Sequence, residues 1–383
     1  MAQDKLLLIP GPSPVLPRIL DRLAEPTVSH VGPEMGADLK ESVANLKKIV
    51  FCERGEAFIV AGAGTLSMEM ALLNTVAPGE RTLVLSQGYF GDRMAEIGSA
   101  FGMGVDLIQS RWGTVVSPDE LAVALRKAVY RVVAVTHVDT ATGSCAPVEE
   151  YARIVRPTGA LFIVDGVCAT GGIPERMDDW GIDVVLTAAQ KCFGIPPGLA
   201  VLVLSERAMD KRKSMPSVPA YYADLLRWLP IMNDPAKYFS TPCVNEIRSF
   251  AEGTRVILEE GIENRFRRHG LFARAIRAGL SALGFTFLTD SSCLADTLSV
   301  AVYPEGIEDK AFRGRYAEKG VVVAGGLAQT AGKVFRMGHM GNLTRDQVEF
   351  ALSALEETLA DLGVRREPGA AVAAARRILE GRP

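Results

Sequence analysis

The chain has 383 residues, 48% of them hydrophobic and 23% charged, with a formal net charge of -3. This composition is typical of a globular protein with a sizeable core and excludes a disordered chain. The near balance of 42 basic and 45 acidic side chains gives no sign of a nucleic acid or a membrane as partner. Six scattered cysteines without a C-x-x-C pair, and no apolar stretch of membrane length, predict a soluble cytoplasmic protein.

From about residue 57 to residue 204, short apolar runs alternate with helical patterns. The runs AFIVAGAG, TLVLSQG, VVAVTHVDT, LFIVDG, DVVLTAAQ and LAVLVLS are rich in Val, Ile and Leu and largely lack inside–outside alternation. Strands that are apolar on both faces are typical of parallel sheets covered by helices. The pattern predicts a doubly wound α/β domain whose ligand site lies at the carboxyl ends of the strands. Helices are expected between the strands, over residues 65–76, 91–101, 118–128, 147–157 and 174–180.

The pattern changes near residue 245 to a long, charged, amphipathic helical stretch that runs to residue 285. Its basic run FRRHGLFARAIR is interpreted as a solvated helix face, on which His269 is exposed. The strand-like segments DTLSVAVY, GVVVAG and VFRMGH follow, and then helices over 344–361 and 368–379. These elements predict a second, α+β domain. The expected division is an N-terminal segment 1–20, a large α/β domain 21–255 and a small C-terminal domain 256–383.

Two charged residues end neighbouring predicted strands. Asp165 closes the apolar run LFIV, where a cap or turn aspartate is the ordinary interpretation. Lys191 follows the run DVVLTAAQ and precedes a loop rich in glycine and proline. Because the carboxyl ends of parallel strands meet at one edge of the sheet, we expect the carboxylate and the amine to lie together at the ligand-binding edge.

The stretch FIVAGAGTLSMEMAL, residues 58–72, predicts a strand, a glycine turn and a helix that opens at Thr65. Backbone amides at a helix N-terminus bind phosphate. The GxG also begins a dinucleotide fingerprint, but Ser67 stands at the third glycine and no acid follows about twenty residues later. A nicotinamide-dependent oxidoreductase is therefore disfavoured, and a site for a single phosphate remains open.

A phosphate site, a carboxylate and a lysine at one edge are the groups that pyridoxal 5'-phosphate requires. Its phosphate needs a helix terminus, its pyridine nitrogen a carboxylate and its aldehyde a lysine that forms a Schiff base. The small residues Ala188 and Ala189 beside the lysine allow a cofactor to approach the backbone. An ordered structural lysine before a turn is the alternative interpretation of the same residues.

Eight segments, taken in order, resemble those of the class V aminotransferases, the small-substrate branch of fold-type I pyridoxal-phosphate enzymes. They are LLLIPGPSPVLPRIL, AGAGT, SQGYFGDR, HVDTATG, VDGVCATGGIP, AAQKCFGIPPGLAVL, YFSTP and FRMGHMG. Within that family the chain looks most like alanine–glyoxylate and serine–pyruvate or serine–glyoxylate aminotransferases. The resemblance implies a transaminase that moves an amino group from alanine or serine to glyoxylate or pyruvate, and a homodimer with shared active sites.

The resemblance also implies a role for each matching residue. Lys191 is expected to form the aldimine with pyridoxal phosphate and to move the proton, and Asp165 to pair with the pyridine nitrogen. Arg336 is expected to bind the substrate carboxylate, and Gly11 of the N-terminal segment to line the substrate pocket. Further cofactor contacts are implied for Ala63, Gly64, Thr65, Phe90, Thr140, Val167 and Gln190, and, from the neighbouring subunit, for Tyr238 and Thr241.

Alternatives within the same cofactor class are a transaminase for aspartate or 2-aminoethylphosphonate, and a lyase or desulfurase. The desulfurase interpretation needs a catalytic cysteine, and Cys243 is not an obvious one. Cys192, next to Lys191, is interpreted as a packing residue because no base can be placed beside it. A silent binding protein on this fold is disfavoured by the presence of Lys191, Asp165 and Arg336.

Three histidines were assigned by their place in the motifs. His30 is expected near the active-site entrance or in a capping role, His137 at a strand end, and His339 next to Arg336. No histidine has a partner at a spacing that indicates a metal site.

Overall fold

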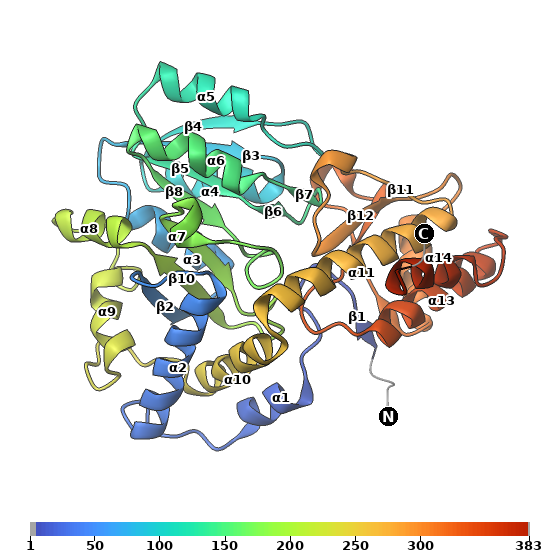
Figure 1. Cartoon of the computed structure of the whole chain (residues 1–383), viewed down its shortest axis with the longest axis horizontal. Helices are drawn as coiled ribbons and strands as arrows, with labels where there is room; N and C mark the ends of the chain where they lie inside the picture. The colour runs from blue at the N-terminus through green and yellow to red at the C-terminus, as the bar shows by residue number, and fades with distance from the viewer. Residues whose placement is uncertain (1–4, 382–383) are drawn as a thin grey trace.

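The computed structural model describes residues 5–381. Figure 1 shows a large sheet flanked by helices, which the N-terminal part of the chain builds, and a smaller sheet with helices at the C-terminal end. The large sheet has seven strands in the order β2-β10-β9-β8-β5-β3-β4. They are β2 (Glu56–Ala61), β3 (Arg81–Ser86), β4 (Gly104–Gln109), β5 (Val132–Thr136), β8 (Leu161–Asp165), β9 (Val184–Ala188) and β10 (Leu199–Leu204).

The strands β4, β3, β5, β8 and β9 are parallel neighbours, which confirms the prediction of a mainly parallel sheet. The strand β10, whose pattern placed it with the parallel strands, is instead antiparallel to both β2 and β9. All six of its residues are buried. Burial on both faces makes a strand uniformly apolar whatever its direction, so the pattern alone does not distinguish the two.

Helices pack against the large sheet and fill the connections between its strands. The helices predicted near 65–76, 91–101, 118–128 and 147–157 are present with shifted ends, whereas only four residues of the predicted 174–180 are helical. Two short strands, β6 (Val138–Asp139) and β7 (Ser144–Cys145), form a hairpin after β5. The helices are α1 (Pro17–Ala24), α2 (Pro33–Ile49), α3 (Gly64–Leu73), α4 (Tyr89–Ala100), α5 (Pro118–Lys127), α6 (Val148–Val155), α7 (Met177–Trp180), α8 (Glu206–Ser214) and α9 (Leu225–Asn233).

The helical stretch predicted over 245–285 is two helices, α10 (Val244–Glu260) and α11 (Ile262–Ala282). Gly261 separates them with a φ of 82°, a conformation that side chains other than that of glycine rarely adopt. Arg267 and Arg274 of the basic run are exposed, as expected of a solvated helix face. The expectation that His269 is exposed is wrong, since its side chain is fully buried, as is that of Arg265 just before the run. Figure 1 shows α11 running from the end of α10 to the C-terminal part of the molecule, where α13, α14 and β12 pack against it.

The C-terminal sheet has the order β11-β12-β15-β14 and is antiparallel. The N-terminal segment joins this part of the molecule, because β1 (Leu6–Leu7) pairs in parallel with β13 (Val321–Val322) and Leu8 belongs to the C-terminal core. The helices predicted over 344–361 and 368–379 are present within two residues at each end. The remaining elements are β11 (Thr286–Phe287), β12 (Leu298–Val302), α12 (Asp309–Glu318), β14 (Ala324–Gly325), β15 (Val334–Gly338), α13 (Arg345–Asp361) and α14 (Ala370–Leu379).

Within residues 5–381, none of the helices has both the length and the apolar character that crossing a membrane demands.

Candidate active site

A pocket of about 150 Å³ lies at the carboxyl ends of β5, β8 and β9. It contains every predicted cofactor and catalytic residue except Tyr238 and Thr241. The side chains of Met68, Arg93, Thr136, Val138 and Cys168, which the sequence analysis did not select, complete the wall. The full lining is Ala63, Gly64, Thr65, Met68, Phe90, Arg93, Thr136, Val138, Thr140, Asp165, Val167, Cys168, Gln190 and Lys191.

Asp165 is the last residue of β8 and is 1% exposed. One carboxylate oxygen accepts a hydrogen bond from Thr136 Oγ1 at 3.0 Å, and the other accepts one from the Val167 amide at 3.0 Å. Thr136 is its register partner on β5, so the sheet itself aligns the two side chains. Burial raises the pKa of Asp165 to about 7, against the effect of these hydrogen bonds. The carboxylate thus sits where a cationic partner would stabilise its charged form.

Lys191 lies three residues beyond β9, the parallel neighbour of β8. Its Nζ donates a hydrogen bond to the carbonyl oxygen of Pro10, and its own carbonyl oxygen accepts one from Ser13 Oγ at 2.6 Å. The Ser13 amide also bonds the carbonyl oxygen of Gln190 at 3.0 Å. Hydrogen bonds at Pro10 and at Ser13 therefore hold the N-terminal segment against Gln190 and Lys191.

Gly11 shows how closely this segment approaches the lysine. A Cβ atom built on Gly11 would lie 2.1 Å from Cδ of Lys191, and the glycine has a φ of 89°. Any side chain at this position would displace the lysine. Gly11 approaches Lys191 but is not among the residues that line the pocket, and its predicted role in the substrate pocket stays a prediction.

The N-terminus of α3 points into the pocket at Ala63, Gly64 and Thr65. Ala63 is its N-cap residue and offers no side-chain hydrogen bond, so no side chain caps this helix. A Cβ atom on Gly64 would lie 2.9 Å from Val167 Cγ2 and would narrow the pocket. Free helix N–H groups and the helix dipole favour an anion at such a position.

Phe90 is placed by a residue that the sequence analysis did not select. Asp139 is fully buried, and its carboxylate accepts hydrogen bonds from the amides of Phe90 at 2.8 Å and Ala141 at 2.8 Å. Burial raises the pKa of Asp139 to about 6. The aspartate caps the start of α4 and fixes Phe90 at the pocket wall. The sequence contained a signal for Asp139, because this acid stands near the end of the predicted strand VVAVTHVDT.

Arg93 is a second unselected residue, one turn along α4 from Phe90. Its guanidinium carbon lies 4.7 Å from the centre of the Phe90 ring, and its Nη1 lies 3.4 Å from Thr65 Oγ1. No carboxylate forms an ion pair with it among the described residues. The arginine therefore brings positive charge to the anion-binding end of the pocket.

Arg336 lies on β15 beside the pocket but does not line it. Its Nε donates to the carbonyl oxygen of Gly325 at 2.7 Å, and its Nη1 lies 3.3 Å from the carbonyl oxygen of Thr140. Burial lowers the pKa of Arg336. Because Thr140 lines the pocket, the Arg336 guanidinium lies at the rim of the pocket. Both of these hydrogen bonds go to backbone carbonyl oxygens.

Tyr238 and Thr241 lie outside the pocket of their own chain. Tyr238 is 55% exposed, and its ring centre lies 5.2 Å from that of His30 with the two ring planes tilted by 60°. Thr241 Oγ1 lies 3.5 Å from the Tyr238 hydroxyl. These three residues form one surface group, and their predicted contribution to a neighbouring subunit stays a prediction.

His339 and Cys192 are buried in surroundings that indicate structural roles. His339, which the sequence predicts next to Arg336, is fully buried, and its ring bonds Ser299 Oγ at 3.0 Å. Burial lowers the pKa of His339 to about 3. Cys192 is fully buried beside Lys191, and burial raises its pKa, in agreement with a packing role.

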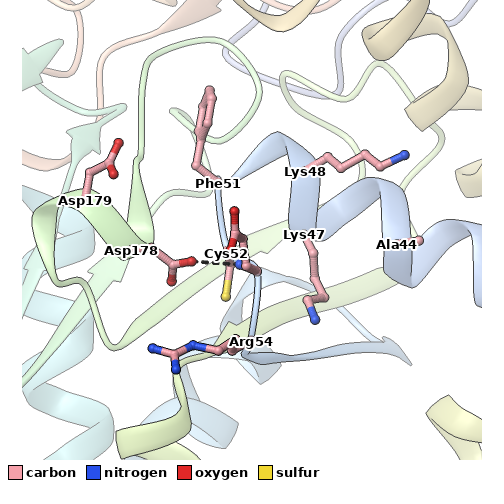
Figure 2. A pocket seen from close by; sticks show the side chains of 9 residues that line it. Ala44, Lys47, Lys48, Phe51, Cys52, Arg54, Asp178 and Asp179 are labelled. Atoms are coloured by element: carbon pink, nitrogen blue, oxygen red, sulfur yellow. Dashed lines mark hydrogen bonds between the residues drawn. The ribbon is translucent and has the colours of Figure 1, made fainter.

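A larger hollow, of about 1150 Å³, lies elsewhere, where the end of α2 meets α7. Figure 2 shows Lys47 and Lys48 on one side of this hollow, Asp178 and Asp179 on the other, and the Arg54 side chain below Asp178. Asp178 Oδ2 accepts a hydrogen bond from the amide of Glu53 at 2.8 Å, which ties the loop after α2 to α7. None of the predicted site residues lines this hollow.

A lysine and a carboxylate at the carboxyl edge of a mainly parallel sheet, beside an uncapped helix N-terminus, define an enzyme of the fold-type I aminotransferase class. The class V aminotransferase family matches residues 16–349, and the chain belongs to that family.

Relatives agree with this assignment over nearly the whole chain. An uncharacterized aminotransferase of Methanocaldococcus jannaschii is 37% identical, with 97% of each chain covered. The L-aspartate–glyoxylate aminotransferase of Paracoccus denitrificans is 32% identical, with 98% of this chain and 96% of the relative covered. The crystal structure of an alanine–glyoxylate aminotransferase from Nostoc superposes with a TM-score of 0.89 at 31% identity, covering 94% and 96% of the two chains.

Proposed function

We propose that this aminotransferase uses pyridoxal 5'-phosphate to move an amino group from alanine or serine to glyoxylate or pyruvate. The observation that carries the proposal is the convergence of Lys191, Asp165 and the free N-terminus of α3 in one pocket. Asp165 ends β8, Lys191 follows β9 and the third group is the start of α3. Three separate elements therefore bring these groups to one place.

The pocket residues fit the cofactor on two observations. Oε1 of Gln190 is buried without a hydrogen-bond partner among the described residues, and the start of α3 is uncapped. Buried polar atoms are rarely left without partners, so these groups indicate a bound polar ligand. Gly64 and Thr65 would hold the phosphate by their amides, Arg93 would add a positive charge, and Phe90 would lie against the ring.

When bound, the cofactor supplies an aldehyde carbon that takes up the amino group and a ring that draws electrons from the substrate Cα. Asp165 would hold a proton at the pyridine nitrogen, and the cationic ring would in turn keep this buried carboxylate ionised. Lys191 Nζ would take the proton from the substrate Cα and deliver it to the carbon that is the aldehyde carbon of the cofactor. The clamp of Ser13 on the Lys191 and Gln190 carbonyls fixes the lysine backbone while its side chain moves.

Arg336 would hold the α-carboxylate of the amino acid. Its position next to Thr140 aims a planar, charged donor at the rim, and guanidinium groups bind carboxylates through two parallel hydrogen bonds. The Pro10–Gly11 segment closes over the lysine from the other side.

The enzyme is proposed to work as a cytoplasmic homodimer in which Tyr238 and Thr241 complete the phosphate site of the neighbouring subunit. Their exposure, and their absence from the pocket of their own chain, support this assignment. Light scattering of the purified protein should give twice the mass of the 41.1 kDa chain. A monomer that retains full transamination would contradict the shared sites.

The experiment that tests the function is the visible absorption spectrum of the purified protein during addition of single amino acids without a keto acid. Bleaching of the cofactor band by alanine or serine is the expected result. Bleaching only by aspartate or by 2-aminoethylphosphonate would replace the proposed donor with that amine. A band that no amino acid changes would indicate a lyase, and no band after addition of pyridoxal phosphate would contradict the role of Lys191.

A further inference from the structure

Arg265, near the start of α11, is a fully buried arginine to which the proposed transamination gives no role. Its side chain has no exposed surface. Nε donates a hydrogen bond to the carbonyl oxygen of Gly171 at 3.0 Å. Nη2 donates to the carbonyl oxygen of Cys192 at 2.7 Å and lies 3.2 Å from Oδ1 of Asn342. Nη1 donates to Oε2 of Glu260 at 2.8 Å.

Three of these four partners belong to the segments that follow the residues of the proposed reaction. The glycine carbonyl lies in the loop after β8, the strand that ends at Asp165. The cysteine carbonyl belongs to the residue directly after Lys191. The asparagine lies in the loop after β15, the strand that carries Arg336. A single guanidinium therefore joins the three segments.

The fourth partner, Glu260, balances the buried charge and fixes a second arginine. Arg268 Nε donates to Glu260 Oε1 at 2.6 Å, and its Nη2 lies 3.0 Å from Oε2. The same guanidinium donates to the carbonyl oxygens of Gly341 at 2.9 Å and Leu343 at 3.1 Å. The loop after β15 is thus bound on both sides of Asn342. A buried charge persists in a fold when it is paired and hydrogen-bonded in this way.

The three segments also pack against one another without spare room. A Cβ atom built on Gly194, in the loop after the lysine, would lie 2.2 Å from Nδ2 of Asn342. A Cβ atom on Gly172, in the loop after β8, would lie 2.8 Å from Sγ of Cys192. A shift of one segment would therefore press on the other two, and Arg265 is the side chain that binds all three.

A buried arginine is a poor source of stability but a good source of geometry. Replacement of a buried ion pair by apolar side chains of similar volume is often neutral for stability, because the charges cost much to desolvate. A guanidinium, in contrast, is planar and presents its donors at fixed angles, so it holds several oxygen atoms in one arrangement. Such an arrangement matters where reacting groups must stay aligned, because a displacement of about 1 Å costs about a hundredfold in rate.

We propose that Arg265 is a positioning residue for the transamination, whose guanidinium fixes the Lys191 segment relative to the segments of Asp165 and Arg336. The roles of these three residues rest on the proposed function. The fixing of their backbone segments does not, because it is a property of the cofactor-free chain. The two parts are therefore tested separately.

Arg212 provides a matched control for the loss of a buried arginine. It is 2% exposed, and its guanidinium bonds one carboxylate (Asp224 at 2.7 Å), one amide oxygen (Asn74 at 3.0 Å) and one backbone carbonyl oxygen (Met215 at 3.1 Å). None of these partners lines the small pocket. Arg265→Met and Arg212→Met therefore remove similar interactions, and only the first removes them beside the candidate active site.

The first measurement is hydrogen exchange of the cofactor-free protein, followed by mass spectrometry of its peptides. In Arg265→Met, the amides of residues 166–173 and 190–197 should exchange about tenfold faster, because their loops lose hydrogen bonds to a charged group. In Arg212→Met the same peptides should exchange as in the unaltered protein. Unchanged exchange in a folded Arg265→Met protein, or an equal rise in both variants, would overturn the proposal.

The second measurement is the steady-state kinetics of alanine with glyoxylate in the enzyme loaded with pyridoxal phosphate. In Arg265→Met, kcat should fall by about 10- to 100-fold, since Lys191 is displaced from the reacting carbon. KM for alanine should change by less than about threefold, because Arg336 keeps its own bonds to Gly325 and Thr140. A rise in KM with an unchanged kcat would overturn the proposal. No turnover and no cofactor band in the unaltered protein would instead refute the proposed function, and hydrogen exchange would still decide the role of Arg265.

Arg265→Lys separates charge from geometry. It keeps a positive charge for Glu260, but one ammonium group does not span three segments, so only partial recovery of kcat and of slow exchange is expected. Full recovery would mean that the charge alone suffices and would overturn the proposal. Circular dichroism establishes that each variant is folded, and if Arg265→Met does not fold, the exchange of Arg265→Lys decides the question.

Discussion

The two hollows of this molecule differ in size and in what surrounds their charges. The larger one, at the end of α2, has about 1150 Å³ and a rim of exposed side chains such as Lys48, Arg54 and Asp178. The smaller one has about 150 Å³ and holds Asp165, which is 1% exposed. Charges on an open rim are solvated and screened, whereas a buried carboxylate has a raised pKa and interacts strongly with any cation nearby. The candidate active site is distinguished by the burial and the convergence of its charged side chains, and not by its volume.

Three variants at the small pocket or beside it, at Lys191, Asp165 and Arg336, each have a matched variant on the rim of the large hollow, which makes the comparison testable. If the small pocket carries the chemistry, the first of each pair should change the reaction and the second should not.

Lys191→Ala should have the largest effect, because it removes both the group that binds the cofactor and the base at the substrate Cα. Turnover of alanine with glyoxylate should fall by more than about a thousandfold. The matched variant Lys47→Ala should keep the rate of the unaltered enzyme. Substantial transamination by Lys191→Ala would remove the basis for the proposed mechanism.

Asp165→Asn should come next, since it keeps the shape of the side chain but removes the charge that holds the ring proton. We expect kcat/KM to fall by about two orders of magnitude. Asp178→Asn, which retains an acceptor for the Glu53 amide, is the control. A similar loss in both variants would mean that the effect is on folding and not on chemistry.

Arg336→Gln removes the proposed carboxylate clamp. A charged hydrogen-bonding partner of this kind contributes about 1.5–3 kcal/mol, which corresponds to a loss of about 10- to 100-fold in kcat/KM for the amino acid. Affinity for the cofactor should remain unchanged. Arg54→Gln on the rim of the large hollow should alter neither quantity. Weaker cofactor binding in Arg336→Gln but not in Arg54→Gln would indicate that Arg336 binds the cofactor and not the substrate.

The raised pKa of Asp165 predicts how the stability of the cofactor-free protein depends on pH. The folded chain retains a proton at Asp165 up to about pH 7, whereas the unfolded chain has lost it near pH 4. Unfolding therefore releases a proton in this window, and stability falls by about 1.4 kcal/mol per pH unit as the pH rises through it. Asp165→Asn should lack this component, so its melting temperature relative to the unaltered protein should rise from pH 5 to pH 7 and level off above. A constant difference across this range would contradict the assignment.

Arg93→Gln should have the smallest effect. The loss of one partly exposed positive charge near the phosphate should weaken cofactor binding by about 1 kcal/mol, or roughly fivefold. Titration of the cofactor-free protein with pyridoxal phosphate measures this constant, and Arg93→Lys should restore most of the affinity. Unchanged binding in Arg93→Gln would assign the arginine to packing on Phe90.

Much of the fold and of the candidate site could be predicted from the sequence. Continuous apolar runs predicted the buried strands, and an acid and a lysine at two run ends predicted that Asp165 and Lys191 would share an edge, as they do. Strand-end residues are predictable in this way because parallel strands all present the same end to the ligand.

Residues that act across elements were harder to find. Arg93 and Ser13 lie on ordinary amphipathic or loop positions, and only the packing of α4 and the N-terminal segment brings them to Thr65 and Lys191. The burial of Arg265 and His269 was missed for the same reason. Helical spacing gives the faces of α11, but not which elements cover them, namely α10, α13, α14 and β12.

By itself, the sequence determined which segments become strands and helices and which charged groups stand at their ends, because those properties depend on local periodicity. The tertiary structure alone decided the direction of β10, the break at Gly261 and the partner of each buried charge. Such contacts depend on how elements pack against one another, and a pattern read along one chain does not contain that information.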